Sequence, residues 1–231
     1  MNSFNKKIAI VIPVYNEQEI IQNVILNVKK ELSELDYQIL ILNDGSKDKT
    51  EEKLKIFEND KRISIINKLN EGHGKTLIRG YDLALKTNCD FILQIDSDDQ
   101  IPINELSKIL ENSKDHDLIT GYRYKRNDPL IRILTTNIMK IVTLLRHGVY
   151  IKDANVPFRV MSKSFLKNNL NKVKNSDVPN ILLSIIGKKK FKFKQVKTFH
   201  KERDTGEASI KRFKLFIFCI KTFLEILKFK F

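Results

Sequence analysis

The first 120 residues alternate short apolar runs with helix-like segments, and this alternation restricts the possible folds more than any other feature of the chain. The strand-like apolar runs lie at residues 7–12, 37–42, 62–66, 90–95 and 118–120. The helix-like segments lie between them, at residues 17–35, 48–57, 73–86 and 102–112. Strands that alternate with helices in this way predict an α/β fold, in which a mainly parallel sheet carries helices on both faces.

The pattern becomes less regular after residue 121. We expect a helix over 129–146, a loop and a strand over 150–160, and a helix over 178–186. Lysines alternate with Phe or Val over 189–199, which is typical of a strand with one apolar face. A basic, Phe-rich helix is expected over 207–230.

Three polar clusters directly follow three of the predicted strands. They are P-V-Y-N-E at 13–17, N-D-G-S at 43–46 and D-S-D-D-Q at 96–100. In an open α/β sheet, ligands bind just outside the carboxyl ends of the strands. We therefore expect the three clusters to form one site, and we expect Pro13 to end the first strand.

The third cluster has the composition of a metal site. Asp96, Asp98 and Gln100 are oxygen donors at alternate positions, which can converge at a strand end because successive strand residues point to opposite faces. Two carboxylates held close together repel each other, and a hard divalent cation that bridges them to a diphosphate reverses this effect. The alternative is a polar loop ahead of the helix expected from Pro102. Asp99 is expected to point the other way.

The first two clusters suit a nucleotide. Asp44 lies in a turn signal and is a candidate to reach a base or ribose. The alternative is a plain turn in which Ser46 or Asp48 caps the next helix. Tyr15 can pack on a nucleobase and Glu17 can accept a hydrogen bond from it, although Glu17 is also a good residue for a first helical turn.

The run N-E-G-H-G-K-T at 70–76 is not a phosphate-binding P-loop. That motif needs a glycine five residues before its G-K-T triplet, and Leu69 occupies this position. Gly72 and Gly74 at the start of the predicted helix still allow a close approach of the backbone to a nucleotide.

The net charge of +14 is distributed unevenly. Residues 1–120 contain 16 Lys or Arg against 21 Asp or Glu, a net charge of −5, and residues 121–231 contain 26 against 7, a net charge of +19. A basic second half favours an anionic partner, such as nucleic acid, a phosphorylated lipid or an anionic membrane, and the alternative is a solvated lysine-rich surface. Two cysteines far apart in sequence, no signal peptide and no apolar run of about 18 residues fit a cytoplasmic protein.

Taken together, the motifs resemble those of family 2 glycosyltransferases, most of all the branch of dolichol-phosphate mannose synthases and polyprenyl-phosphate glycosyltransferases. The shared motifs are V-I-P-V-Y-N-E (11–17), N-D-G-S-x-D-x-T (43–50), N-x-G-x-G-x-x-x-x-x-G (70–80), D-x-D-x-Q-x-P (96–102) and G-Y-R (121–123). The similarity is strong over 7–126 and continues at D-A-N-V-P-F-R (153–159) and H-K-E-R-D-T-G-E-A-S (200–209).

This resemblance implies a Rossmann-like GT-A fold. It implies a glycosyltransferase domain over 1–205, with a nucleotide-sugar half at 1–126 and an acceptor half at 127–205. An amphipathic C-terminal helix over 206–231 would follow.

The resemblance also implies roles for individual residues. It assigns the donor, a GDP- or UDP-sugar, to Pro13, Tyr15, Glu17, Asp44 and Asp96. It assigns Mg²⁺ or Mn²⁺ to Asp96, Asp98 and Gln100. It places Arg123, Arg159, His200 and Arg203 at phosphates of the donor or the acceptor, a contact that suits fixed guanidiniums. Asn155-Val156-Pro157 departs from the small residue or glycine that usually precedes Phe-Arg in the synthases, and this leaves the identity of the acceptor open.

We therefore expect a metal-dependent, inverting glycosyltransferase that moves a sugar to a polyprenyl (dolichyl-type) phosphate or a related membrane acceptor. The metal held by Asp98, together with Arg123 and Arg203, would stabilise the departing diphosphate. A lipid phosphate is already anionic and needs no general base. A hydroxyl acceptor, in the synthesis of a surface polysaccharide or lipopolysaccharide, needs one. Asp177 is the candidate base, although it could equally cap the next helix.

A nucleic-acid-binding protein is a less favoured alternative. Only the net charge supports it, because the acidic clusters lie in the expected ligand cleft and no nucleic-acid-binding motif occurs in the sequence. We therefore expect no nucleic-acid partner.

The C-terminal segment, 210–231, combines phenylalanines with lysines and arginine on a broad apolar helix. It suits the interface of an anionic membrane, so we expect peripheral association with the inner face of the membrane. The alternative is a helix packed on the domain or on a second copy in a homo-oligomer. The membrane interpretation predicts that removal of 210–231 lowers activity on a lipid acceptor and changes donor hydrolysis much less.

Overall fold

The computed structural model describes residues 6–100, 102, 104–124, 130–199, 201 and 212–231. The strands are β1 (Ile8–Val14), β2 (Tyr37–Asp44), β3 (Ile63–Lys68), β4 (Phe91–Gln94), β5 (Leu118–Tyr124), β6 (Arg159–Ser162) and β7 (Phe193–Phe199). The α-helices are α1 (Ile21–Glu31), α2 (Thr50–Leu54), α3 (His73–Lys86), α4 (Glu105–Glu111), α5 (Leu130–His147), α6 (Lys163–Val173), α7 (Pro179–Lys190) and α8 (Arg212–Lys228). Short 3₁₀ turns extend α2 and α4, at Lys55–Phe57 and Asn112–Asp115.

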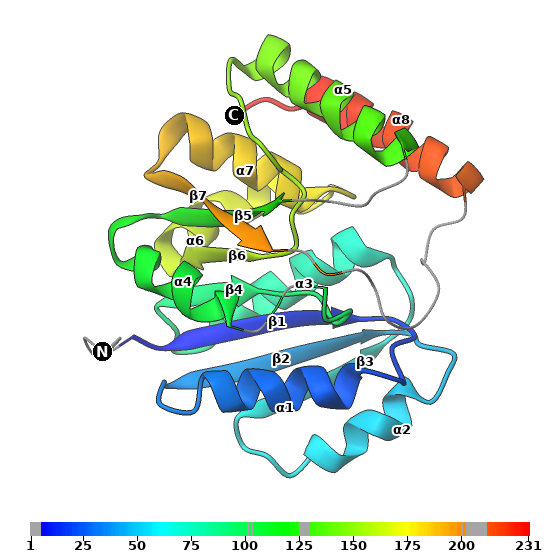
Figure 1. The fold of residues 1–231 in the computed structure, drawn as a ribbon, viewed down its shortest axis with the longest axis vertical. Coiled ribbons are helices and arrows are strands. Elements are labelled where there is room, and N and C mark those ends of the chain that lie inside the picture. Colours follow the sequence, from blue (N-terminus) through cyan, green and yellow to red (C-terminus); the bar gives the residue numbers. More distant parts are fainter. Residues whose placement is uncertain (1–5, 101, 103, 125–129, 200, 202–211) are drawn as a thin grey trace.

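All seven strands form one sheet in the order β3-β2-β1-β4-β6-β5-β7 (Figure 1). Every pair is parallel except the two that β6 makes, which run antiparallel to β4 and to β5. The mainly parallel sheet predicted from the sequence is confirmed. The interior strand β1 is buried along its whole length, as expected for a strand covered on both faces.

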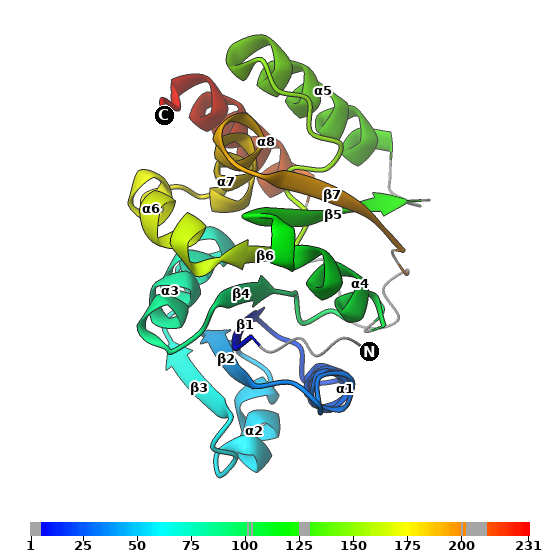
Figure 2. The same ribbon diagram turned by 90° about the vertical axis from the view of Figure 1, so that its left-hand side faces the viewer.

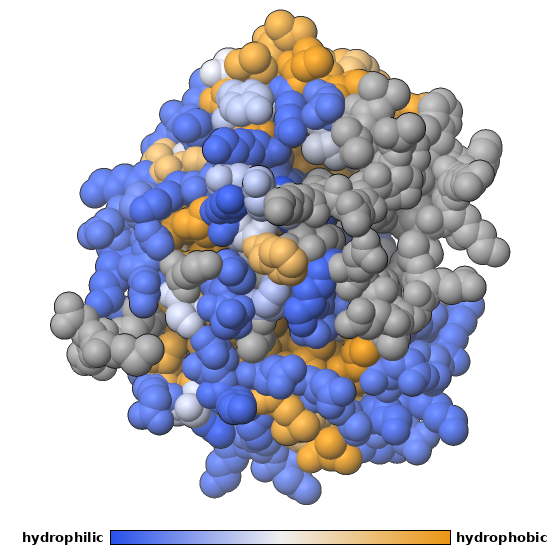
Figure 3. Space-filling view, viewed as in Figure 1, coloured by the Kyte–Doolittle hydropathy of each residue, from blue (hydrophilic) through white to orange (hydrophobic). Residues whose placement is uncertain are grey.

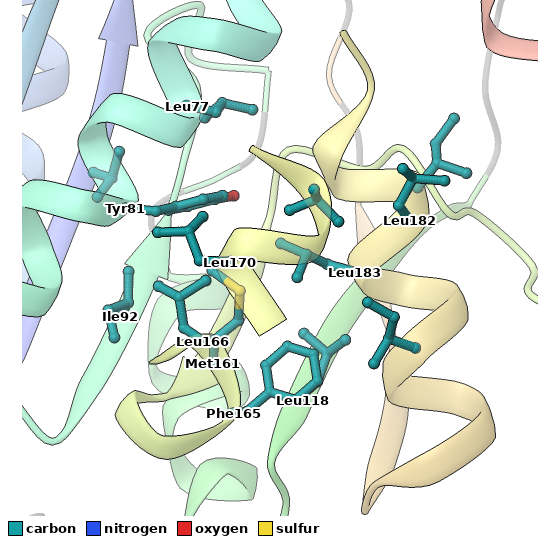
Figure 4. Packing of buried hydrophobic residues seen from close by; sticks show 14 of the residues in the cluster. Leu77, Tyr81, Ile92, Leu118, Met161, Phe165, Leu166, Leu170, Leu182 and Leu183 are labelled. Carbon is teal, nitrogen blue, oxygen red and sulfur yellow. The ribbon is translucent and has the colours of Figure 1, made fainter. Parts of the chain in front are cut away.

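Helices cover both faces of the sheet, and each face has its own core (Figure 2). On one face α1, α2 and α4 pack on the apolar residues of β1, β2 and β4 that point toward them. On the other face α3, α6 and α7 pack on the alternate residues of the same strands. Figure 4 shows this second core, to which α3 contributes Leu77 and Tyr81, β6 contributes Met161, and α6 contributes Phe165 and Leu166. Together the two cores hold the strand ends in fixed positions.

Two details of the first half differ from expectation. Pro13 does not end the first strand, which continues to Val14 alongside β2. The ladder between β1 and β4 ends at Val11, so no strand partner faces the N–H that proline lacks. In addition, α1 begins at Ile21 rather than at Glu17, because residues 15–20 form the turn that carries the first polar cluster.

The helix α6 was missed by the sequence analysis. Ser162 caps it, since its Oγ accepts a hydrogen bond of 3.1 Å from the backbone N–H of Phe165. Phe165, Leu166, Leu170 and Val173 then form its buried face at helical spacing. Both signals are visible in the sequence, so this helix could have been predicted.

The helices α5 and α8 lie side by side at one end of the molecule (Figures 1 and 2). The guanidinium Nε of Arg146 donates to the Leu227 carbonyl at 2.9 Å, and His147 Nε2 lies 2.8 Å from the Ile226 carbonyl. Thr222, Ile226 and Phe229 are buried against the domain. The described part of α8 is therefore packed on the protein. Within the described ranges, no helix is long and apolar enough to cross a membrane.

Candidate functional site

The loops that follow β1 and β2 are joined by hydrogen bonds, so the first two polar clusters meet as expected. The backbone N–H of Asn16 donates to Ser46 Oγ at 3.0 Å, and its side-chain Oδ1 accepts from the N–H of Lys47 at 2.8 Å. The N–H of Glu17 donates to Thr50 Oγ1 at 2.8 Å. Asn16 has a φ of 55°, which asparagine tolerates better than most residues. These bonds fix the turn that presents Tyr15.

The three residues of the first cluster assigned to the nucleotide have different exposures. Pro13 is buried in β1, Glu17 is almost buried beside Thr50, and Tyr15 is half-buried at the start of the turn. Tyr15 therefore offers ring surface to a ligand at this edge of the sheet. Direct contact of any of the three with a base stays a prediction.

Asp44, at the end of β2, binds the loop that precedes α3. Its carboxylate accepts from the N–H groups of Glu71 and Gly72, at 3.0 Å and 3.1 Å, and pairs with the buried ammonium of Lys68. Burial alone would raise the pKa of Asp44, but the hydrogen bonds from Lys68 and Glu71 outweigh it and hold that pKa below its ordinary value of 3.8. Asp44 thus shapes the 69–72 loop beside the site, a role that the sequence analysis did not assign to it.

Asp96 lies just beyond the end of β4 and is the most electrostatically perturbed acid of the site. Its side chain is 23% exposed, and His73 Nε2 lies 4.0 Å from its Oδ1. Among the described residues this buried Oδ1 has no hydrogen-bond partner. Burial, and then the neighbouring Asp98 carboxylate, raise the pKa of Asp96 well above its usual range, while Arg123 opposes them. The sequence did not single out His73 as a site residue. The available signal was its position between Gly72 and Gly74, at the start of a predicted helix.

The remainder of the third cluster is a loop rather than a strand end. Because β4 ends at Gln94, strand alternation is not what places Asp96, Asp98 and Gln100. A turn at Asp99, with a φ of 51°, brings the N–H of Gln100 to within 3.3 Å of Asp98 Oδ1. Lys201 holds the loop from outside: its carbonyl accepts from Gln100 Nε2 at 3.4 Å, and its Nζ lies 3.1 Å from Asp99 Oδ2. Asp99 pairs with Lys201 and also lines the same small pocket as Asp96 and Asp98, so the expectation that it points the other way is not confirmed.

Arg123, near the end of β5, is fixed by Asp153. The guanidinium donates to the two carboxylate oxygens through Nε at 2.7 Å and Nη2 at 3.1 Å. Both side chains are largely buried, at 15% and 6% exposure. Arg123 is close enough to Asp96 to lower the pKa of that acid. The D-A-N-V-P-F-R run at 153–159 resembles a family motif, but its first residue, Asp153, was not among the predicted site residues.

Arg159 is buried rather than exposed at the site, and its expected contact with an acceptor phosphate stays a prediction. Its side chain is fully buried, and its guanidinium donates to the carbonyls of Asn180 and Val156 at 2.9 Å and of Ala154 at 3.2 Å. Burial lowers the pKa of Arg159. The side chain ties the loop between α5 and β6 to α7, and that loop carries Asp153.

The remaining predicted residues are Asp177, which lies beside the start of α3, and His200 and Arg203. Asp177 precedes α7, its side chain is exposed, and its backbone carbonyl packs on Gly74 at the start of α3. The role of the Asp177 carboxylate as a base stays a prediction. His200 and Arg203 lie outside the described residues.

The geometry agrees with comparisons to known proteins. The model of the family described as "Glycosyl transferase family 2" matches residues 9–176, which contain all the clusters above. This chain belongs to glycosyl transferase family 2. It is a glycosyltransferase, and the family predicted from the motifs is confirmed.

Two relatives of this glycosyltransferase have names that include a polyprenyl phosphate. The UDP-N-acetylglucosamine–dolichyl-phosphate N-acetylglucosaminyltransferase of Methanococcus voltae is 29% identical over 186 residues, which cover 71% of this chain and 72% of that protein. The undecaprenyl-phosphate 4-deoxy-4-formamido-L-arabinose transferase of Photorhabdus laumondii is 25% identical over 217 residues, which cover 91% of this chain and 65% of the relative.

Solved structures confirm the GT-A fold of the glycosyltransferase. Glucosyl-3-phosphoglycerate synthase from Mycobacterium tuberculosis, in complex with Mn²⁺, UDP and phosphoglyceric acid, superimposes with a TM-score of 0.67 at 14% identity. The match covers 98% of this chain and 80% of that structure. The same protein in complex with Mn²⁺ and UDP-glucose gives a TM-score of 0.64 at 16% identity. At these identities the likeness establishes the fold alone.

The carboxylates of Asp96 and Asp98 suit a divalent cation whose other ligands would come from a bound phosphate group and water. No group of three or more His, Cys, Asp or Glu side chains with the geometry of a metal centre occurs in the described part of the chain. Asp96 and Asp98 supply two carboxylates, and the buried Oδ1 of Asp96 accepts no hydrogen bond from the part of the chain that the structure describes. Mg²⁺ and similar ions commonly bind through one or two carboxylates and complete their coordination with substrate phosphates and water. The donor set therefore suits a metal–diphosphate complex better than a permanent metal centre.

Proposed function

We propose that this glycosyltransferase transfers a sugar from a nucleoside-diphosphate sugar to a polyprenyl phosphate or a related membrane acceptor, with Mg²⁺ or Mn²⁺ bound to the diphosphate. The observation that carries the proposal is the buried Oδ1 of Asp96 in the loop after β4, which accepts no hydrogen bond among the described residues and lies beside the Asp98 carboxylate. Two carboxylates in this position are unfavourable until a cation neutralises them, as the raised pKa of Asp96 indicates.

Each part of the site then has a task in the transfer. Asp96, Asp98 and Gln100 would hold the metal, which supplies positive charge to the leaving diphosphate. The Asp153-bound guanidinium of Arg123 adds a second, fixed positive charge close to the same place, and Tyr15 covers the base. The bond from the anomeric carbon to the diphosphate oxygen breaks while a bond to an acceptor oxygen forms on the opposite face, so the configuration inverts.

An acceptor phosphate suits the groups at hand. A phosphate monoester is anionic at neutral pH and attacks without transferring a proton to the protein. The names of both relatives with a stated acceptor support this choice. A hydroxyl acceptor requires a base, and Asp177 is the candidate because it lies next to α3, close to the entrance of the site. The Asp177 carboxylate is exposed, and its backbone N–H is held by Glu225 of α8. A hydroxyl acceptor is therefore the second choice.

A surface for the membrane lies at the end of the molecule formed by α5 and α8. Large apolar side chains are exposed along both helices: Ile138, Ile141, Leu144 and Leu145 on α5, and Ile220, Leu224 and Leu227 on α8. Figure 3 shows the apolar surface at the upper end of the molecule, where Figure 1 places α5. Lys221 and Lys228 are exposed on α8 among these residues. We propose that this apolar and basic surface lies on an anionic bilayer at the cytoplasmic face, which extends the membrane expectation from α8 to α5.

The experiment that tests the proposal is a transfer assay with matched acceptors. Radiolabelled UDP- and GDP-sugars are incubated with the protein, Mn²⁺ and vesicles that contain undecaprenyl or dolichyl phosphate. Label in the lipid phase that depends on Mn²⁺ and on the phosphate group supports the proposal. Transfer to the corresponding free alcohol or to a soluble glycan at an equal or higher rate would replace it with the hydroxyl-directed alternative.

A further inference from the structure

The C-terminal helix carries a single acidic residue, and that residue faces the domain. Glu225 is the only Asp or Glu between residues 210 and 231. It lies between Thr222 and Phe229 on the buried side of α8, opposite the exposed face of Ile220, Leu224 and Leu227. A carboxylate is unfavourable next to an anionic bilayer, so its inward position needs a partner inside the protein.

The partners of Glu225 are two residues of the turn that precedes α7. One carboxylate oxygen accepts a hydrogen bond from the hydroxyl of Ser176, and the other accepts from the backbone N–H of Asp177 at 3.1 Å. Ser176 Oγ in turn accepts from the N–H of Val178 at 2.9 Å. Glu225 thereby supplies an acceptor from another helix to the N–H groups at the start of α7, where negative charge is also favoured by the helix dipole.

This turn packs directly on the helix that carries the loop of the donor site. A Cβ placed on Gly74 would lie 2.2 Å from the carbonyl oxygen of Asp177, so the two backbones are in contact. Gly74 follows His73, whose Nε2 lies 4.0 Å from Asp96 Oδ1. Two residues earlier, the N–H of Gly72 donates to Asp44. A short series of contacts therefore joins α8 to the acids at the ends of β2 and β4.

We infer that Glu225 is a positioning residue for the donor site: it holds the Ser176–Asp177 turn against Gly74, and the turn holds the 71–74 loop in place. The helix that we assign to the membrane is thus also part of the support of the site. The inference concerns the same site as the proposed function and rests on it. It changes the expectation for removal of 210–231, because the deletion would release the turn and expose core residues, so donor hydrolysis would fall together with transfer.

The test compares Glu225→Ala and Glu225→Gln with Glu34→Ala, an exposed glutamate in the loop after α1. Amide hydrogen exchange is measured by mass spectrometry in full-length protein without ligand. We expect Glu225→Ala to accelerate exchange at least several-fold in peptides that cover 71–76 and 176–178, while β1 and α1 keep wild-type exchange. Glutamine retains one acceptor oxygen, so Glu225→Gln should show a smaller effect, and Glu34→Ala none.

A kinetic measurement accompanies the exchange. For metal-dependent hydrolysis of the donor without acceptor, Glu225→Ala should raise KM several-fold more than it lowers kcat, because the loop must be ordered again when the donor binds. If Glu225→Ala fails to fold, Ser176→Ala, which keeps the carboxylate and removes one of its donors, must show the same local acceleration. Unchanged exchange at 71–76 in folded Glu225→Ala or in Ser176→Ala would overturn the inference. Because exchange needs no substrate, this outcome is independent of whether the proposed transfer is observed.

Discussion

Asp153 binds Arg123 through two hydrogen bonds, of 2.7 Å and 3.1 Å, and both side chains are largely buried. The pair joins β5 to the loop before β6, and it directs a fixed positive charge toward the acids after β4. Bidentate pairing of this kind depends on the planar fork of arginine and on both oxygens of the carboxylate.

Replacement of Asp153 by Asn should therefore lower transfer more than it lowers stability. The amide can accept only one of the two bonds, so Arg123 loses its fixed orientation, and a small misplacement costs up to about 100-fold in rate. We expect kcat to fall by about 10- to 100-fold, and a similar fall for Arg123→Lys. Steady-state kinetics and thermal melting of both variants check this. A rate within twofold of wild type in Asp153→Asn would show that the pair is only structural.

Replacement of Asp98 by Asn should abolish transfer and leave the fold intact. Asp98 lies in a loop at the edge of the site and contributes no apolar contact to either core. We expect activity below about 1% of wild type, comparable to removal of a main electrostatic group in other enzymes. Circular dichroism should be unchanged. Full activity of Asp98→Asn in Mn²⁺ would contradict the assignment of this carboxylate to the metal.

Asp44 should make a contribution to stability that disappears in acid. Its pKa is lower in the folded protein than the ordinary 3.8, so its stabilising effect is complete above that value and is lost as the pH falls through the lower, folded pKa. At pH 7 Asp44→Asn should lower the free energy of unfolding by about 3 kcal/mol, since it leaves the buried ammonium of Lys68 with only the half-exposed Glu71 as a counter-charge. Urea unfolding at pH 7, 4 and 3 should show this difference shrink below pH 4. A difference that is constant with pH would be inconsistent with the buried pair.

Gly80 lets α3 approach the sheet, so a methyl group there should destabilise the fold. An added Cβ would lie 2.4 Å from Val11 Cγ1 and 3.0 Å from Leu42 Cδ1, and both of these side chains are fully buried. We expect Gly80→Ala to cost about 1–3 kcal/mol, which is typical of overpacking. Arg79→Ala, at the exposed neighbouring position, is the control. Equal urea midpoints for the two variants would show that α3 moves away freely.

One isoleucine and one leucine exposed on α5 allow a test of the proposed membrane surface. Ile141 and Leu145 are 56% and 81% exposed, so the double variant Ile141→Asp, Leu145→Asp should fold normally. It should no longer float with vesicles that contain anionic lipid, and binding of the wild type should weaken with salt. If the double variant floats with vesicles as the wild type does, α5 is not part of the membrane-binding surface. Loss of a dimer in solution would instead identify the surface as a contact between two copies.

Much of the fold could be predicted because local and global signals agree in the first half. The His73–Lys86 helix has its predicted bounds, and the apolar runs of β1 and β2 read directly as buried strands. Pro13 misled the prediction because its effect depends on where the neighbouring ladder ends, which is a tertiary property. The antiparallel insertion of β6 could not be deduced either, since a strand of four residues has no periodicity that reports its direction.

The site was predictable in composition and less so in arrangement. The motifs singled out Asp96, Asp98 and Asp44 as candidates, but only the structure shows that Asp44 binds Lys68 and the backbone of residues 71–72. Arg159 illustrates the limit most clearly. The family resemblance places Arg159 at a phosphate, yet its side chain is buried. The carbonyls of Ala154, Val156 and Asn180 accept from its terminal nitrogens, and its Nε has no partner among the described residues. Asp153 and Glu225 could be recognised only from their partners.

The central claim is that Asp96 and Asp98 bind a nucleoside diphosphate through a divalent cation, and calorimetric titration tests it most directly. UDP and GDP are titrated into the wild-type protein in excess Mn²⁺ and in excess EDTA, at fixed pH and salt. We predict that the preferred nucleotide binds at least tenfold more tightly in Mn²⁺, and that Asp98→Asn removes this difference. Equal affinity in Mn²⁺ and EDTA would contradict the claim, because the diphosphate would then lie away from the two carboxylates.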